Sequence, residues 1–308
     1  MDIYLCSTVR NLLFALLKGL STPEQLSYII LVTDQQNIER ENFNLRSLPS
    51  YIKIVFIKRK EINISLSRHR GGKLIKILAA FNIYTTPSLQ SHFNQLIFKK
   101  LISINEDIKI LKKANLYLFN DRSKIARLLR LGFKEYSIIE DGLSNYRGIK
   151  FKLFEKLMHL LKFSHQKQRY LGDNTRCKYI YLLNVDNAPL YLKNKIKAID
   201  FINSSLINQY CLAFFKADMI DHNDQYILAT QPISIAEFSK LDFDLCVYDK
   251  VLKYFKSKNI NCVLKVHPRE KLQRFRDKFP ETKLVESKIP LELMLFNNKQ
   301  KSNIISIY

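Results

Sequence analysis

Short apolar runs alternate with amphipathic segments along the chain. The runs in the first half are rich in Ile, Leu, Val and Tyr, which is typical of strands buried on both faces of a parallel sheet. Apolar residues at helical spacing, such as Leu12 and Leu16 or Ile125 and Leu129, separate them. The predicted strands of this half are 3–6, 27–32, 52–57, 115–120 and 136–142.

The second half repeats this alternation. Its predicted strands are 178–183, 225–232, 260–266, 283–286 and 304–308, with a helix around 248–255. Two Rossmann-like α/β domains fit the pattern and the length of 308 residues. We predict an N-terminal domain over 1–150, a basic linker over 151–175 and a C-terminal domain over 176–308.

The segment 147–174 breaks the pattern, because it is basic and partly amphipathic and ends in turn residues. Two interpretations stay open: a helix lying on an acidic membrane surface, or a linker helix packed on one domain with a solvated lysine face. The longest early apolar stretch, 12–17, is far shorter than the roughly 20 residues of a spanning helix, so we expect neither a membrane span nor a signal peptide.

Composition narrows the environment and the partners. The five cysteines are scattered and form no CxxC or other metal-ligand spacing, which indicates a reducing cytoplasm and no structural zinc. The net charge of +22 predicts an anionic partner: nucleic acid, an acidic membrane or a phosphorylated donor. GxGxxG and Walker A patterns are absent, which argues against dinucleotide and P-loop sites.

Polar residues that follow an apolar run are the first candidates for chemistry, because ligands of parallel sheets bind beyond the carboxyl ends of the strands. Glu140, Asp141 and Gly142 follow one such run. A carboxylate there can act as a general base toward a sugar hydroxyl, with the glycine allowing close approach. The same triplet also fits an ordinary turn.

The second candidate follows the run at 260–264. Strand alternation places Lys265 and His267 on one face, and Pro268 suits the first position of a helix, so His267 is expected at the positive end of that helix. With charge from Lys265 or Arg269, this outlines a phosphate site, although a satisfied histidine in a turn is the alternative. Thr230 and Gln231 form another polar turn after a strand.

Four stretches in this order resemble glycosyltransferase family 52, the bacterial lipooligosaccharide sialyltransferases. They are IIEDGLSNY, YILATQPIS, VLKVHPRE and KLVESKIPLELM. The acidic-Asp-Gly and His-Pro motifs are each short, but their combination in this order is specific.

The resemblance implies a GT-B-like fold, with two Rossmann-like domains facing a central cleft, and an inverting transfer from CMP-sialic acid to a terminal galactose of lipooligosaccharide. Asp141 would be the general base, and His267 the general acid or the phosphate stabiliser. No metal or other cofactor is implied. The donor would be bound by Glu140, Gly142, Thr230, Gln231, Lys265, Pro268, Arg269, Pro290 and Glu292.

The implied partners are a nucleotide-sugar donor and a glycolipid acceptor, with peripheral contact to an anionic membrane and either a monomer or a homodimer. The expected location is the cytoplasm or the inner face of the bacterial inner membrane. In the family a hydroxyl pair that follows the last strand contacts the donor phosphate, and a closing helix comes after it. Here the chain stops at the run 304–308 and the expected serine pair is missing, so either the sequence is truncated or Ser302 and Ser306 substitute for the pair.

Three rival functions remain. A family member with another donor, such as a glucose nucleotide, would carry the same motifs. A truncated relative that binds CMP with little activity would also fit. A nucleic-acid-binding protein fits the charge, but the basic residues are spread along the chain without a recognisable binding motif, so we expect no nucleic-acid partner.

Overall fold

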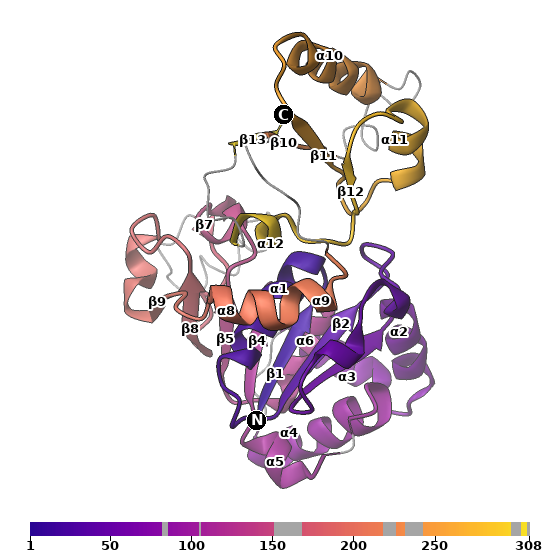
Figure 1. The fold of residues 1–308 in the computed structure, drawn as a ribbon. Coiled ribbons are helices and arrows are strands. Elements are labelled where there is room, and N and C mark those ends of the chain that lie inside the picture. The colour runs from indigo at the N-terminus through magenta and orange to yellow at the C-terminus, as the bar shows by residue number, and fades with distance from the viewer. Residues whose placement is uncertain are drawn as a thin grey trace. The chain divides into compact units, whose positions relative to one another are not determined.

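The computed structural model describes residues 1–81, 86–104, 106–150, 168–217, 226–231, 243–296 and 303–306. The chain forms two compact units (Figure 1). Unit 1 holds residues 1–32 and 50–202, and unit 2 holds residues 33–49 and 203–308.

Unit 1 is built on a seven-stranded parallel sheet with the order β3-β2-β1-β4-β5-β8-β9. Its strands are β1 (Asp2–Cys6), β2 (Ser27–Val32), β3 (Ile52–Ile57), β4 (Asn115–Leu118), β5 (Tyr136–Ile139), β8 (Cys177–Leu182) and β9 (Ile196–Ala198). All residues of β1 and β2 are buried, as their continuous apolar runs predict. The first five strands lie where the sequence places them.

Helices cover the two faces of this sheet. Ile3 and Leu5 of β1 belong to one apolar core with residues of α2–α6, whereas Tyr4 points to the opposite face. There its ring stacks on Tyr117, and Lys18 of α1 lies over that ring. The helices are α1 (Val9–Leu20), α2 (Arg59–Arg68), α3 (Gly72–Phe81), α4 (Pro87–Asn94), α5 (Ile108–Lys112) and α6 (Lys124–Leu129), with a π-helical turn at Gln95–Leu101.

Unit 2 contains a four-stranded parallel sheet with the order β12-β11-β10-β13. The strands are β10 (Tyr226–Ala229), β11 (Cys262–Lys265), β12 (Leu284–Val285) and β13 (Asn303–Ser306). Its helices are α8 (Ser204–Leu206), α9 (Leu212–Phe214), α10 (Phe243–Ser257), α11 (Leu272–Lys278) and α12 (Leu291–Phe296). Leu228, Tyr248, Leu264 and Phe275 pack together in its core.

The units differ from the predicted ranges 1–150 and 176–308. Strand β8 pairs with β5 in unit 1, with Tyr136 opposite Cys177, so the first unit continues to residue 202. Residues 33–49 belong to unit 2, where Phe43 stacks on Phe214 at a ring distance of 5.0 Å. Residues 151–167 of the predicted linker 151–175 lie outside the described residues, and residues 168–175 are described.

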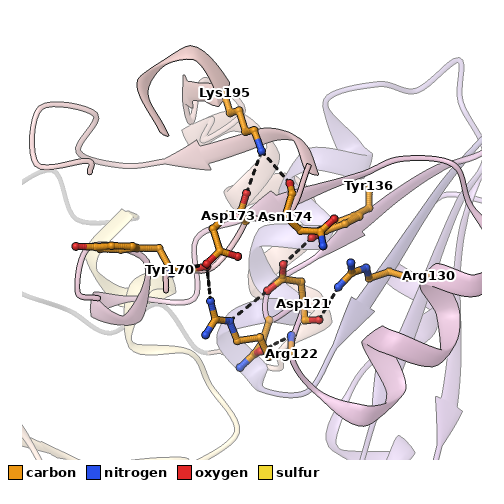
Figure 2. Close-up of polar contacts among 10 residues, drawn as sticks. Asp121, Arg122, Arg130, Tyr136, Tyr170, Asp173, Asn174 and Lys195 are labelled. Atoms are coloured by element: carbon orange, nitrogen blue, oxygen red, sulfur yellow. Dashed lines mark hydrogen bonds and ion pairs between the residues drawn. The ribbon is translucent and has the colours of Figure 1, made fainter. Parts of the chain in front are cut away.

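A partly buried polar network holds residues 168–176 in unit 1 (Figure 2). Arg122 follows β4 and donates from Nη2 to the Tyr170 carbonyl at 2.6 Å and to Asp173 Oδ2 at 3.1 Å. Next to it, the Tyr136 hydroxyl donates to Asp121 Oδ2 at 2.6 Å. These bonds hold the segment that connects β7 (Gln168–Arg169) to β8. Strand β7 forms a two-stranded antiparallel ladder with β6 (Ile149–Lys150).

The α/β class with mostly parallel sheets is confirmed. Within the described residues, no helix combines the length and the apolar character needed to cross a bilayer.

Candidate active-site residues

The sheet of unit 1 has the strand order of a doubly wound fold, which marks the edge where a ligand binds. Strands β2 and β3 lie on one side of β1, and β4 and β5 lie on the other. Crevices in such sheets open beyond the carboxyl ends of the strands where the order reverses. The chain after β1 and the chain after β5 therefore supply the first residues to consider.

Asp141 follows β5 and is held by two asparagines. Asn11 in the first turn of α1 donates from Nδ2 to Asp141 Oδ1 at 2.8 Å, and the Asp141 N–H donates to Asn145 Oδ1 at 2.7 Å. Oδ2 has no hydrogen-bond partner among the described residues. Burial raises the pKa of Asp141, against the lowering effects of the Asn11 bond and the Arg10 charge. One oxygen of a stronger base is thus fixed and the other is open to a ligand.

Asn11 is itself fully buried and held at both ends. Its N–H donates to Thr8 Oγ1, the N-cap of α1, at 3.1 Å, and its Oδ1 accepts from the Ser7 N–H at 3.2 Å. Sequence reasoning missed Asn11. The one available signal was a polar residue inside the buried run of α1.

Glu140 has a different role from its neighbour. It is 4% exposed, and both of its carboxylate oxygens have partners. Arg10 pairs with Oε1 at 3.1 Å, while the Tyr146 hydroxyl and the Leu183 N–H donate to Oε2 at 2.5 and 2.8 Å. Glu140 therefore connects the ends of β5 and β8, and Asp141 is the carboxylate of this pair with fewer side-chain partners.

Gly142 is required by its backbone conformation. Its φ of 90° lies in the region that L side chains rarely adopt, whereas nothing lies within 4 Å of a Cβ built there. Open space beside Asp141 is what an acceptor needs.

In unit 2 the polar candidates gather at the carboxyl ends of three neighbouring strands. Thr230 and Gln231 follow β10, and His267 follows β11. The strand register places Ala229 of β10 beside both Lys265 and Ser306, the last residue of β13. Gln231 Nε2 donates to Ser306 Oγ at 3.1 Å, so Ser306 lies at this edge of the sheet; Ser302 lies outside the described residues.

Backbone hydrogen bonds fix both the position and the tautomer of His267. Its N–H donates to the buried Thr230 Oγ1 at 2.8 Å, and its Nδ1 accepts from the Arg269 N–H at 3.1 Å. The ring proton therefore lies on Nε2. Burial, together with the charges of Arg269 and Lys265, lowers the pKa of His267 to about 4, so the imidazole is neutral at pH 7 and donates through Nε2–H.

Glu270 completes the histidine turn and was missed by sequence reasoning. The Thr230 hydroxyl donates to its Oε2, and its Oε1 is buried without a hydrogen-bond partner in the described part of the chain. Burial raises the pKa of Glu270 to about 7, with a further contribution from Asp244. Nothing in the motif HPRE distinguishes this glutamate from a solvated one.

Lys265 lies beneath the turn, where its side chain is buried. Nζ donates to the carbonyl oxygens of Val266 at 2.9 Å and of Glu286 at 3.0 Å, so it joins the ends of β11 and β12. Burial lowers the pKa of Lys265 to about 7, opposed chiefly by Glu292 in the first turn of α12. Pro290, immediately before α12, is buried.

The helix expected to begin at Pro268 does not. Residues 267–270 form a turn, in which the Glu270 N–H donates to the His267 carbonyl at 2.9 Å, and α11 begins at Leu272. The prediction of a helix running through Glu270 with His267 at its start was wrong. Thr230 accepts from the His267 N–H and donates to the Glu270 side chain, and these two contacts hold residues 267–270 in a separate turn. Arg269 is exposed on this turn.

Comparison with known proteins decides the family. The sequence model of glycosyltransferase family 52 matches residues 76–308, about three quarters of the chain. The chain belongs to glycosyltransferase family 52. The match contains both Asp141 and His267, and the resemblance seen in the four motifs is confirmed.

One solved structure similar to this family 52 glycosyltransferase is an α/β-galactoside α-2,3-sialyltransferase from the luminous marine bacterium Photobacterium phosphoreum. The similarity has 12% sequence identity and a TM-score of 0.49, and covers 98% of this chain and 88% of that one. No curated protein matches the chain. Among the described residues, no three His, Cys, Asp or Glu side chains are grouped to hold a metal ion.

Proposed function

We propose that this family 52 glycosyltransferase moves a sialyl group from CMP-sialic acid to a hydroxyl of a terminal galactose on lipooligosaccharide, with Asp141 as the general base. The observation that carries the proposal is the Asp141 carboxylate at the doubly wound edge of unit 1, with Oδ1 bound to Asn11 and Oδ2 without a hydrogen-bond partner among the described residues. The four motifs all lie within the matched range and support a family 52 transferase, and the donor is the part that the experiment below decides.

The base step follows from the geometry of Asp141. The acceptor O–H donates to Oδ2, and its proton passes to the carboxylate as the oxygen forms a bond to the anomeric carbon of the donor. The bond from that carbon to the phosphate oxygen breaks, and CMP leaves with the electron pair. Attack on the face opposite CMP inverts the anomeric centre. A raised pKa makes the Asp141 carboxylate a stronger base toward the acceptor proton.

The departing CMP needs stabilisation of the charge that develops on its phosphate. His267 offers Nε2–H as a fixed neutral donor, because Arg269 holds its other ring nitrogen. With its pKa lowered to about 4, His267 acts as a hydrogen-bond donor and does not need to release a proton. Of its two expected roles, phosphate stabiliser fits this environment better than general acid.

The proposal is tested by release of the nucleotide from CMP-sialic acid, with and without a galactose-terminated acceptor, and in parallel from a glucose nucleotide. We expect acceptor-dependent release from CMP-sialic acid and no release from the glucose nucleotide. Release from the glucose nucleotide instead would assign another donor within the same family. CMP binding without release would indicate a nucleotide-binding relative, and absence of CMP binding would reject the sialyl proposal.

A further inference from the structure

Helix α3 has an apolar stripe on its outer face. Leu74, Ile77 and Phe81 are 60%, 51% and 68% exposed. Their spacing of three and four residues places them on one side of the helix, and we call these three residues the α3 stripe. Singly exposed apolar side chains are ordinary, but an aligned series on one helix marks an interaction surface.

The opposite face of α3 is anchored in unit 1, so the stripe is a fixed feature. Ile75 and Ala79 belong to the apolar core of the sheet. Gly72 lets α3 start close against α2, because a Cβ there would lie 1.6 Å from the Leu66 carbonyl oxygen. Lys76 Nζ also donates to Ser67 Oγ of α2 at 2.8 Å. Figure 1 shows α2 and α3 next to each other in unit 1.

The surroundings of the stripe are strongly basic. Residues 58–76 contain seven Lys or Arg residues and one acidic residue, Glu61. Arg68, Arg70 and Lys73 are exposed in the segment where α2 ends and α3 begins. Apolar side chains bordered by cationic ones are suited to the surface of an anionic bilayer. The apolar side chains enter the acyl region, and the cationic side chains contact the lipid phosphates.

We propose that the α3 stripe and the basic residues beside it dock this enzyme on a bilayer surface that contains anionic phospholipids. Self-association through the stripe would bring two such cationic regions together, which charge repulsion opposes. Docking would bring the enzyme to an acceptor carried by a lipid, and this role of docking rests on the proposed function. Binding of the α3 stripe and its basic neighbours to anionic lipid does not depend on which donor the enzyme uses.

Co-sedimentation with phosphatidylcholine vesicles, with and without phosphatidylglycerol, tests the proposal. We expect the parent protein to bind only the vesicles with phosphatidylglycerol, and Leu74→Ser/Ile77→Ser/Phe81→Ser to bind about ten-fold more weakly. Leu190→Ser is the matched apolar control, since Leu190 is 77% exposed elsewhere in unit 1. It should bind like the parent, and unfolding temperatures should agree because all four residues are exposed.

Two charge-reversal variants distinguish docking through this surface from a general effect of the net positive charge. Lys73→Glu should weaken vesicle binding by about ten-fold, while Lys250→Glu, an exposed lysine of α10 in unit 2, should have little effect. Equal binding by the parent and the triple serine variant would overturn the proposal, as would equal losses in both lysine variants. A triple variant that only dissociates a dimer would assign the stripe to a second copy and overturn it too.

Activity assays keep this inference separate from the proposed function. The triple serine variant should transfer to a soluble galactoside at the parent rate and lose transfer to a vesicle-embedded glycolipid. Absence of transfer by the parent to the soluble acceptor would contradict the proposed function and leave the vesicle-binding result to decide the docking.

Discussion

The Asp141 site in unit 1 and the His267 turn in unit 2 have similar construction, but the pKa values of the two side chains are shifted in opposite directions. Both follow a strand of a parallel sheet, and both have one side-chain atom held by a neighbouring donor. Burial raises the pKa of Asp141 and lowers that of His267 to about 4. Burial disfavours the charged form in each case, so it yields a stronger base in one unit and a neutral donor in the other.

The difference also lies in what holds each group. Asp141 is oriented by the side chain of Asn11, whereas the bond on the His267 ring comes from the Arg269 backbone N–H. A side-chain contact can be removed by one substitution, but a backbone contact cannot. In unit 1, substitution of Asn11 should change the orientation and the pKa of Asp141 while the carboxylate itself stays. In unit 2, only substitution of His267 itself is available, and it removes the Nε2–H donor.

The largest effect is expected for Asp141→Asn. The amide has nearly the same shape but cannot accept the acceptor proton, so kcat for transfer should fall by about 100- to 10,000-fold. CMP binding, measured by calorimetry, should stay unchanged. A variant with near-parent kcat would reject Asp141 as the base.

A somewhat smaller effect is expected for His267→Ala, which removes the Nε2–H donor. Transfer should fall by about 100-fold because the phosphate charge loses one fixed partner. His267→Gln can present an N–H in a similar place and should recover part of the rate. Equal rates for the Ala and Gln variants would contradict donation through Nε2–H.

The next effect concerns pH. Transfer should decline as pH falls through the pKa of Asp141, because only the carboxylate accepts a proton. The Asn11 bond lowers that pKa, so Asn11→Leu should move this acid limb to higher pH and reduce the rate by about ten-fold or less. Asn145→Ser is the control: it alters only the contact to the Asp141 N–H, and its acid limb should stay in place.

The smallest effect is expected for Ser306→Ala. It removes the bond from Gln231 at an edge of unit 2, which is worth about 1 kcal/mol. CMP affinity should fall by less than about ten-fold. A loss comparable to that of His267→Ala would show that Ser306 contacts the phosphate itself.

Local patterns predicted the strands but not their assignment to units. The apolar runs at β1 and β2 predict buried strands directly, and all residues of both strands are buried. The placement of β8 beside β5 depends on the Arg122 contacts with residues 170 and 173, about 50 positions away. No local pattern contains that information.

The candidate site follows the same rule. Asp141 and His267 were predicted because strand-end position and motif agree. Asn11 contacts Asp141 across 130 positions, and the pKa of Glu270 is raised by burial in the folded unit and by the nearby Asp244. The turn at Pro268 differs from the predicted helix because Thr230 contacts both His267 and Glu270 and holds residues 267–270 as a separate turn.

The most direct test is a side-by-side measurement of CMP release from CMP-sialic acid by Asp141→Asn and His267→Gln, with and without acceptor. The account predicts that Asp141→Asn loses the release that depends on acceptor and keeps the slow release to water, whereas His267→Gln lowers both. Acceptor-dependent release that survives in Asp141→Asn would contradict the assignment of the base to unit 1.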